Sequence, residues 1–421
     1  MRVIVVGAGA AGTMAAIFAA GSGAETLLLE RTKDGGRKIL ISGGGRCNIL
    51  PARLDETRFV TESSPHTLRK IVRSWPLGAQ VAFFEREIGL PLVEEVESAK
   101  LFPQSQRARD VRDRLLELAA AKGATLRMNT LVTGFAPAGA GWRVDITGAP
   151  PEHADALIVA TGGLSVPHTG SDGAGLQVAA ALGHTVHRTY PALTPLTADP
   201  APFGSLAGIS LPVTLTARAG KIGANATGGF LFTHRGYSGP SVLDVSHVAV
   251  RSRAEEATES PARINVRWTT LGDEEWTRAL TAPGSRTVLA TLSAELPARL
   301  AEALIVHTGV DPKLSIASLT RRDRLRLVET LVRGVLPWNG DEGYRKAEVT
   351  GGGVALAEID PRTMESRTHK GLFLCGEMLD AFGPIGGYNF LWAWATGRAA
   401  GLGAAQAAII GGSVPRDIDS R

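Results

Sequence analysis

The hydrophobic pattern at the start of the chain changes from that of a strand to that of a helix within a short stretch. Residues 3–6 are a run of valine and isoleucine, which predicts a buried β-strand. Residues 7–12 contain only glycine and alanine, and residues 13–20 are mostly helix formers. A second strand-like segment follows at 25–29 and ends in three leucines. This order predicts a strand, a tight turn, a helix and a second strand, as in a Rossmann-like α/β fold.

The glycines of the predicted turn have the spacing G-x-G-x-x-G. Gly7 permits a sharp turn, Gly9 lets a pyrophosphate approach the backbone, and Gly12 allows the helix to pack closely on the strand. The free N–H groups at the start of the helix favour phosphate binding. Glu30 ends the second strand, where a carboxylate accepts hydrogen bonds from an adenosine ribose. The alternative is a glycine turn in some other α/β fold.

The apolar pattern also predicts the elements that follow. Residues 66–90 and Val111–Lys122 have helical periodicity, and we expect Asp110 to cap the second helix. Strand-like pieces at 125–135 and 142–147 predict a small β-meander, and 156–160 predicts a buried strand that returns to the parallel sheet. Further β patterns occupy 211–217 and 229–233, and residues 284–336 are mostly helical.

The C-terminal part of the chain contains a second strand, glycine turn and helix. Residues 371–375 predict a strand, Glu377 follows it, and a helix is expected from Tyr388 to about Leu402. This arrangement favours contacts of Glu377 with the ribityl hydroxyls of FAD while the helix N-terminus faces the flavin. We therefore predict an FAD-binding domain made of residues 1–190 and 347–421. An inserted domain at 191–346 has a nested helical part at about 284–336.

Residues 35–48 form a loop that contains three consecutive glycines. Such a stretch packs poorly, so its usual purpose is to let a ligand lie against the main chain. Arg37, Lys38 and Arg46 have the charge to neutralise phosphates, and Asn48 can bond the edge of a heterocycle. A flexible surface loop is the alternative.

Composition places few further limits on function. The 421 residues are 44% hydrophobic and 20% charged, with a net charge of +4. The two cysteines, Cys47 and Cys375, exclude a disulfide framework and favour a reducing cytoplasm. The first strand begins at residue 3 and no uninterrupted apolar run is long enough to cross a bilayer, so we expect neither a signal peptide nor a membrane span. The basic run 321–326 predicts a solvated helix face more than a nucleic-acid patch.

Taken together, these motifs resemble those of the YhiN/BaiN-like flavoproteins, the BaiN/RdsA family of NAD(P)/FAD-dependent oxidoreductases. Cys375 departs from the small residue expected there and is interpreted as a buried, inert thiol. The resemblance implies an FAD-binding domain with an inserted β-barrel-like and helical module, and reduction of C=C bonds conjugated to a carbonyl. It rests on residues 7–12, 36–48, 101–103, 160–163, 169–171, 231–234, 238–240, 350–354, 363–366 and 386–389.

Most of the expected FAD-binding residues lie in these motifs, and the others lie in or near the strands of the predicted FAD-binding domain. They are Gly7, Gly9, Ala10, Ala11, Gly12, Glu30, Arg31, Lys38, Ser42, Gly43, Gly44, Arg46, Cys47, Asn48, Val132, Ala160, Thr161, Gly162, Gly376, Glu377, Gly386, Gly387, Tyr388 and Asn389. No metal site is predicted.

The expected chemistry requires a proton donor and a group that polarises the carbonyl of the substrate. His234, Tyr237 and Tyr388 are the candidates because each lies in a glycine-rich loop that the resemblance places near the flavin, and Cys47 is a weaker one. Only one strand-linked G-x-G-x-x-G is present, so NADH or NADPH is expected to dock transiently as the electron donor. The substrate is expected to be an unsaturated carbonyl, carried by a small molecule or by RNA.

Three alternatives stay open. The first is reductive modification of uridine in ribosomal RNA, and the second is a non-catalytic or redox-sensing flavoprotein. The third is an NAD site at the N-terminal motif, against which residues 376–377 argue.

Overall fold

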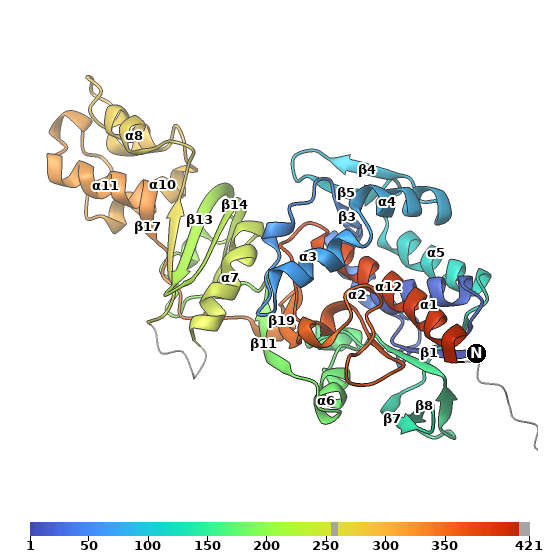
Figure 1. The fold of residues 1–421 in the computed structure, drawn as a ribbon. Coiled ribbons are helices and arrows are strands. Elements are labelled where there is room, and N and C mark those ends of the chain that lie inside the picture. The colour runs from blue at the N-terminus through green and yellow to red at the C-terminus, as the bar shows by residue number, and fades with distance from the viewer. Residues whose placement is uncertain (254–259, 412–421) are drawn as a thin grey trace, which may run out of the picture. The chain divides into compact units, whose positions relative to one another are not determined.

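The computed structural model describes residues 1–253 and 260–411. The chain divides into two compact units (Figure 1). Unit 1 comprises residues 1–189 and 349–421, and unit 2 comprises residues 190–348. The linking strands β11 (Val186–Ala192) and β19 (Val349–Val354) pair with each other.

A five-stranded parallel sheet forms the centre of unit 1, in the order β20-β10-β1-β2-β6. Every residue of β10 and β20 is buried, as expected for a parallel sheet covered on both faces. This Rossmann-type sheet confirms the α/β fold class predicted from the sequence. Its strands are β1 (Arg2–Val6), β2 (Glu25–Leu29), β6 (Thr125–Arg127), β10 (Ala156–Val159) and β20 (Leu372–Leu374).

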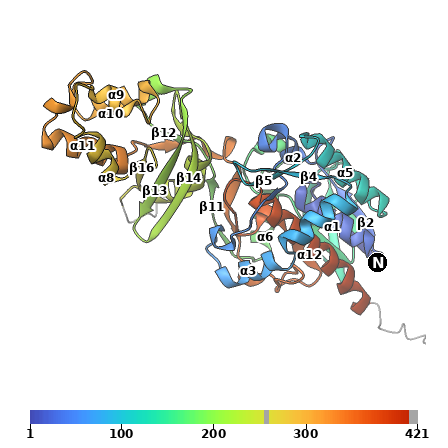
Figure 2. The ribbon, with the colours of Figure 1, turned by 90° about the horizontal axis from the view of Figure 1, so that it is seen from above.

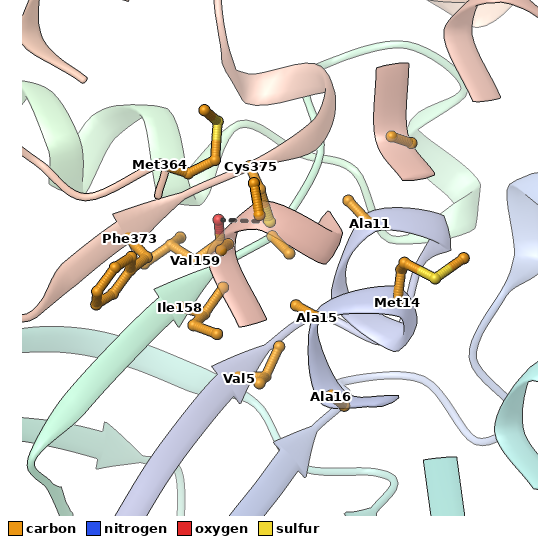
Figure 3. Close-up of a cluster of buried hydrophobic side chains, with 14 of the residues drawn as sticks. Val5, Ala11, Met14, Ala15, Ala16, Ile158, Val159, Met364, Phe373 and Cys375 are labelled. Carbon is orange, nitrogen blue, oxygen red and sulfur yellow. Dashed lines mark hydrogen bonds between the residues drawn. The ribbon is translucent and has the colours of Figure 1, made fainter. Parts of the chain in front are cut away.

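Helices α1 (Ala10–Gly21) and α12 (Tyr388–Gly411) lie side by side against the sheet (Figures 1 and 2). Their close approach depends on two glycines of α12. A Cβ on Gly397 would lie 2.3 Å from the carbonyl oxygen of Ala11, and one on Gly401 would lie 2.3 Å from that of Ala15. Figure 3 shows the core beneath α1, where small side chains meet β10 and β20. The C-terminal segment thus completes the core that the N-terminus begins.

The rest of unit 1 surrounds this centre. Two small antiparallel sheets have the orders β3-β5-β4 and β7-β8-β9. Their strands are β3 (Leu50–Pro51), β4 (Leu92–Glu95), β5 (Lys100–Pro103), β7 (Val132–Ala138), β8 (Gly141–Ile146) and β9 (Glu152–Ala154). The other helices are α2 (Arg37–Ile41), α3 (Pro65–Arg73), α4 (Leu77–Ala82), α5 (Ala108–Ala121) and α6 (Ala174–Ala181).

Four predicted elements differ from the structure. The helix at 66–90 breaks before Pro76, which cannot continue a helix, and resumes as α4 and a π-helical turn, Phe83–Glu87. Helix α5 starts at Ala108 after Arg107, so Asp110 lies in its first turn and is not its cap. The strand at 125–135 is two strands, separated where Asn129 takes a positive φ of 53°. Helix α12 extends to Gly411, past the expected end at Leu402.

Unit 2 contains an antiparallel seven-stranded sheet in the order β17-β16-β13-β14-β15-β12-β18. Helix α7 (Pro240–Ser252) packs on β13 and β14, and α8, α9, α10 and α11 gather near one end of this sheet (Figure 2). The strands are β12 (Leu196–Thr197), β13 (Ser210–Ala219), β14 (Ile222–Thr233), β15 (Gly236–Ser238), β16 (Arg263–Arg267), β17 (Gly334–Val335) and β18 (Gly340–Asp341). The helices are α8 (Asp273–Ala279), α9 (Val288–Leu292), α10 (Ala298–His307) and α11 (Arg321–Arg333). In the part of the chain that the structure describes, no helix is long and apolar enough to cross a membrane.

A buried histidine joins two segments of unit 1. The His184 side chain is fully buried, with Nδ1 2.8 Å from Glu358 Oε2 and Nε2 3.1 Å from Ser366 Oγ. Burial by itself would raise the pKa of Glu358, but hydrogen bonds from Thr185 and His184 outweigh it and lower that pKa below 4.5. Ser366 Oγ also accepts the N–H groups of Thr368 and His369, so this cluster serves as a structural junction.

Replacing Glu358 with glutamine should lower the free energy of unfolding at neutral pH by about 1–2 kcal/mol, since it removes charged hydrogen bonds. A carboxyl with a lowered folded pKa contributes stability above pH 4.5 and loses it as the pH falls through the folded value. Urea unfolding should therefore show the two proteins converging below pH 4.5. A difference that stays constant with pH would contradict this assignment.

Candidate cofactor site

Many of the predicted cofactor residues of unit 1 follow strands of the parallel sheet and lie at one edge of it. Strands β1, β2, β10 and β20 end at Val6, Leu29, Val159 and Leu374, so the residues after them share the carboxyl edge. Side-chain and backbone contacts confirm this proximity. A Cβ on Gly7 would lie 2.6 Å from the Ala160 carbonyl oxygen, and one on Gly376 would lie 2.8 Å from Ala11 Cβ.

The turn between β1 and α1 leaves room for a ligand over Gly9. Gly7 has a φ of 102°, and a Cβ on Gly12 would collide with the Gly7 carbonyl oxygen at 1.8 Å. A Cβ on Gly9, in contrast, would meet nothing within 4 Å among the described residues. In the described part of the chain, no side chain caps the N-terminus of α1. The first N–H groups of this helix are therefore available to an anion. The turn therefore fits a pyrophosphate.

Glu30 holds the turn and faces it. Its Oε2 accepts the N–H of Ala8 at 2.8 Å, and its Oε1 accepts the N–H and the hydroxyl of Thr32 at 2.8 and 2.7 Å. A carboxylate has about four acceptor positions, so about one remains for a ribose hydroxyl. Arg31 points elsewhere and pairs with Asp172. Val132 lies two residues after Thr130. The Thr130 N–H donates to the backbone carbonyl of Glu30, which brings this segment near the end of β2.

Lys38 and Glu377 form the charged centre of the site. Lys38 Nζ lies 2.6 Å from Glu377 Oε2 and donates to Ser165 Oγ at 2.6 Å. Glu377 Oε1 accepts hydrogen bonds from Ser165 Oγ at 2.6 Å and from the N–H and hydroxyl of Thr350, both at 3.0 Å. Four segments distant in the sequence are thus joined through one carboxylate.

Ser165 and Thr350 were not predicted from the sequence as site residues. Ser165 lies two residues after the glycine pair 162–163, and Thr350 precedes a run of three glycines. This closeness to glycine-rich turns is the sequence signal that could have identified them. Asp380 was also not predicted; it is 1% exposed and accepts N–H groups from Glu62 and Ser63. No local sequence signal identifies it.

One hydroxyl at the same edge is buried within the protein. The Thr161 hydroxyl is buried without a hydrogen-bond partner in the described residues. A Cβ on Gly175 of α6 would lie 2.1 Å from this oxygen, so the hydroxyl is enclosed against that helix.

The glycine loop at 42–48 is ordered by its own contacts. Gly43 and Gly44 have φ values of 55° and 68°, and a Cβ on Gly44 would meet nothing within 4 Å among the residues described. Arg46 lies over the Phe102 ring at 4.2 Å and pairs with Glu95 at 2.9 Å, so its charge already has a partner. Ser42 donates to the Ile39 carbonyl. Asn48 is partly buried, and its amide oxygen lies near Gly43.

The turn at Gly386–Gly387 is held from both sides. A Cβ on Gly387 would lie 2.4 Å from the Leu50 carbonyl carbon, so the turn packs against β3. Asn389 bonds the N–H and the carbonyl of Gly383, both at 2.9 Å. Tyr388 is 4% exposed, and its hydroxyl accepts the Asp55 N–H at 3.2 Å. These partners give Asn389 and Tyr388 structural roles at the start of α12.

The other two catalytic candidates lie in unit 2. His234 is exposed at the turn between β14 and β15. Tyr237 is 1% exposed, packs against Phe230 and Phe232, and has no hydrogen-bond partner for its hydroxyl among the described residues. Burial raises the pKa of Tyr237. This is the position of a core residue.

Both cysteines are buried and weakly acidic. Burial raises the pKa of the Cys47 thiol to about 12, and that of Cys375 also to about 12. Cys375 Sγ lies 4.0 Å from the Val159 carbonyl oxygen (Figure 3). A thiol of this pKa is a poor acid near neutral pH. The described residues contain no group of three or more metal-ligating side chains.

Replacing Glu30 with glutamine should reduce FAD retention roughly tenfold. The new NH₂ group faces a donor whichever way the amide turns, because Ala8 donates to one oxygen and Thr32 to the other. Flavin content after dialysis measures the effect. Glu25→Gln, at the exposed start of the same strand, is the matched control. Equal flavin content in the two variants would refute this role for Glu30.

Comparison with known proteins places the chain in one family. Residues 1–403 match the model described as the HI0933-like protein Rossmann domain. A ribosomal RNA dihydrouridine synthase of Escherichia coli is 33% identical over 404 residues, which cover 93% of this chain and 95% of that protein. A 3-dehydro-bile acid delta(4,6)-reductase of Clostridium scindens is 30% identical over 425 residues, covering 96% and 99%.

A solved structure agrees with the fold. The FrdA chain of E. coli quinol fumarate reductase matches with a TM-score of 0.50 at 16% identity, covering 99% of this chain and 72% of that one. At this identity the match supports the fold alone. The relatives cover nearly the full length, and the resemblance to the BaiN/RdsA flavoproteins is confirmed. The chain therefore belongs to the HI0933-like family, and it is an FAD-dependent oxidoreductase.

Proposed function

We propose that this enzyme reduces a C=C bond conjugated to a carbonyl, with FAD held at the carboxyl edge of the unit 1 sheet. The observation that carries the proposal is the full-length similarity to two relatives whose named reactions share this bond. Dihydrouridine arises when the ring double bond of uridine, next to a carbonyl, is reduced. The delta(4,6) double bonds of a 3-dehydro bile acid are likewise conjugated to its carbonyl. Bound FAD would supply the hydride.

The residues of unit 1 would bind and orient the cofactor. The α1 N-terminus and the space over Gly9 suit the pyrophosphate, and Glu30 suits the ribose. Lys38 and Glu377 would face the ribityl and flavin portion, with Ser165 and Thr350 fixing the carboxylate. Such fixed polar groups lower the cost of orienting a bound cofactor.

His234 remains our candidate to protonate or polarise the substrate, because it is exposed and its ring can donate a proton. Tyr237 and Tyr388 are not carried forward, since one is packed in the core of unit 2 and the other is bonded to the backbone. NADH or NADPH is the proposed electron donor and would dock transiently.

An anaerobic absorbance spectrum tests the proposal. The purified protein should have a flavin band at about 450 nm that bleaches on adding NADH or NADPH. A 3-oxo-Δ4 steroid, or a uridine-containing ribosomal RNA fragment, should then restore the band. A band that never bleaches with either nucleotide would remove the proposed electron donor. Bleaching that neither substrate class reverses would contradict the proposed reaction.

Helix α11 favours the RNA substrate as a second candidate. Arg321, Arg322 and Arg324 lie in its first two turns, where the helix dipole disfavours cations. Arg321 and Arg322 are exposed, and a polyanion would relieve this repulsion. Leu327, Val328 and Leu331 bury the opposite face.

Changing these three arginines to glutamate should weaken binding of a ribosomal RNA fragment at least tenfold and flatten its salt dependence. The matched control changes three basic residues on α3 of unit 1 to glutamate, namely Arg69, Lys70 and Arg73. Filter binding at several salt concentrations measures the affinity and its salt dependence for each variant. Equal losses in the two variants, or weak binding that does not depend on salt, would reject this RNA surface.

A further inference from the structure

A pocket of unit 1 lies away from the cofactor site. It has a volume of about 480 Å³ and is lined by the end of α1, by residues 75–87 and by Arg398 of α12. The cofactor site uses the N-terminus of α1, whereas the pocket uses Ile17–Ser22 at the other end. Twelve helical residues separate the two ends by about 18 Å, so the pocket is a distinct site.

Three aromatic rings form one wall of this pocket. Phe18 and Trp75 meet edge to face with centroids 5.6 Å apart, and Phe83 lies 5.4 Å from Phe18 and 5.3 Å from Trp75. Trp75 is 6% exposed, so its neighbours cover most of this ring, whereas Phe18 and Phe83 are partly exposed. The planes of Phe18 and Trp75 meet at 83° and those of Trp75 and Phe83 at 72°, so the rings form an angled aromatic wall against which another ring can pack.

Arg398 sits over this aromatic wall. Its guanidinium carbon lies 5.4 Å from the Phe18 ring centre and 5.3 Å from that of Trp75. Among the described residues, no carboxylate comes within ion-pairing distance of it. Burial lowers the pKa of Arg398 below its ordinary value, yet an arginine stays charged at neutral pH. A partly buried cation without a counter-ion is an attractive partner for an anion.

The net charge of the residues that line the pocket is also positive. Arg86 and Lys122 also line it, together with the carboxylate of Glu87. Arg86 and Glu87 belong to the π-helical turn Phe83–Glu87, a rare distortion that is frequent at functional sites. The turn also supplies Phe83 to the aromatic wall. An aromatic wall, an excess of positive charge and an irregular turn thus converge on one pocket.

We propose that this pocket binds a small anion that carries an aromatic ring. The ring packs against the aromatic wall beside the Arg398 guanidinium, and the anionic group pairs with Arg398 and Arg86. The volume is within the range of ordinary small-molecule sites. This inference is independent of the reaction proposed above, because the pocket shares no residue with the cofactor site.

Titration calorimetry on the full-length FAD-loaded protein tests the proposal with two matched probes. Naphthalene-2-sulfonate carries the ring and the charge, and 2-naphthalenemethanol carries the ring alone. We expect one sulfonate per chain, bound at least about tenfold more tightly than the alcohol. Arg398→Met should weaken sulfonate binding about tenfold and leave alcohol binding within about twofold.

Two further variants make the test decisive. Arg86→Met changes an exposed side chain, keeps the core intact, and should weaken sulfonate binding about threefold even if Arg398→Met does not fold. Arg109→Met, at the opposite end of α5 from Lys122, is the control and should have no effect. Equal affinity for the two probes overturns the proposal. So does sulfonate binding that is unchanged by Arg86→Met, or equally weakened by Arg109→Met.

Discussion

Replacing Gly9 with valine is expected to lower FAD affinity by at least about 100-fold, or about 2.8 kcal/mol, while the apoprotein stays folded. Gly9 has an extended backbone with φ −78° and ψ −170°, which valine adopts readily. Its Cβ would point into open space in the protein alone. The branched side chain would then occupy the space that a pyrophosphate needs at the N-terminus of α1.

Flavin content and apoprotein unfolding separate these two effects. The free energy of unfolding should stay within about 1 kcal/mol of the wild type, the cost of a poorer helix cap. Gly223→Val, in strand β14 of unit 2, is the control and should retain FAD. Full flavin retention by the Gly9 variant would show that the cofactor lies elsewhere.

Replacing Gly397 with alanine should destabilise unit 1 by about 2–3 kcal/mol, although alanine is the better helix former. The added methyl would lie 2.3 Å from the carbonyl oxygen of Ala11, and backbone cannot move aside as a flexible side chain can. Helices α1 and α12 must separate to accept it. Because α1 carries the glycine turn, FAD retention should fall as well.

Gly78→Ala provides the matched control for this packing argument. Gly78 lies in α4, and a Cβ there would meet nothing within 4 Å in the described part of the chain. The change should leave stability unaltered or raise it by up to about 1 kcal/mol. Chemical denaturation of both variants gives the comparison. Similar stabilities of the two variants would mean that α1 and α12 tolerate a wider spacing than the contacts indicate.

Much of the central sheet was predictable because its strands are short and contain apolar runs that end close to a glycine turn or an acid. Residues 3–6, 25–29 and 156–160 share this pattern, and each is a strand of the parallel sheet. Strand β6 was not distinguished from the meander, because its three residues are partly exposed and lack that pattern. The cap of α5 was misplaced because Asp110 suits both a cap and a first helical turn.

The site was predictable where chemistry is local and unpredictable where it depends on distant segments. The glycine turn and Glu30 are close to one another in the sequence and follow a known spacing. The hydrogen bonds around Glu377 join it to Lys38, 339 positions away, and to Ser165, 212 positions away. No periodicity or motif reports such a pairing. The same holds for Arg398 and Trp75, which meet only in the folded protein.

Because β20 and α12 come late in the chain, the two units become able to fold at different times during synthesis on the ribosome. Residues 190–348 are continuous, so unit 2 can fold as soon as it emerges. Unit 1 has to wait, because an edge strand of its sheet and the helix that packs on α1 are made last. Until then the N-terminal segment of unit 1 exposes an unpaired β10 edge and the apolar side of α1. A protein chain truncated before residue 372 would lack β20 and α12. We expect such a chain to be prone to aggregation and unable to retain flavin.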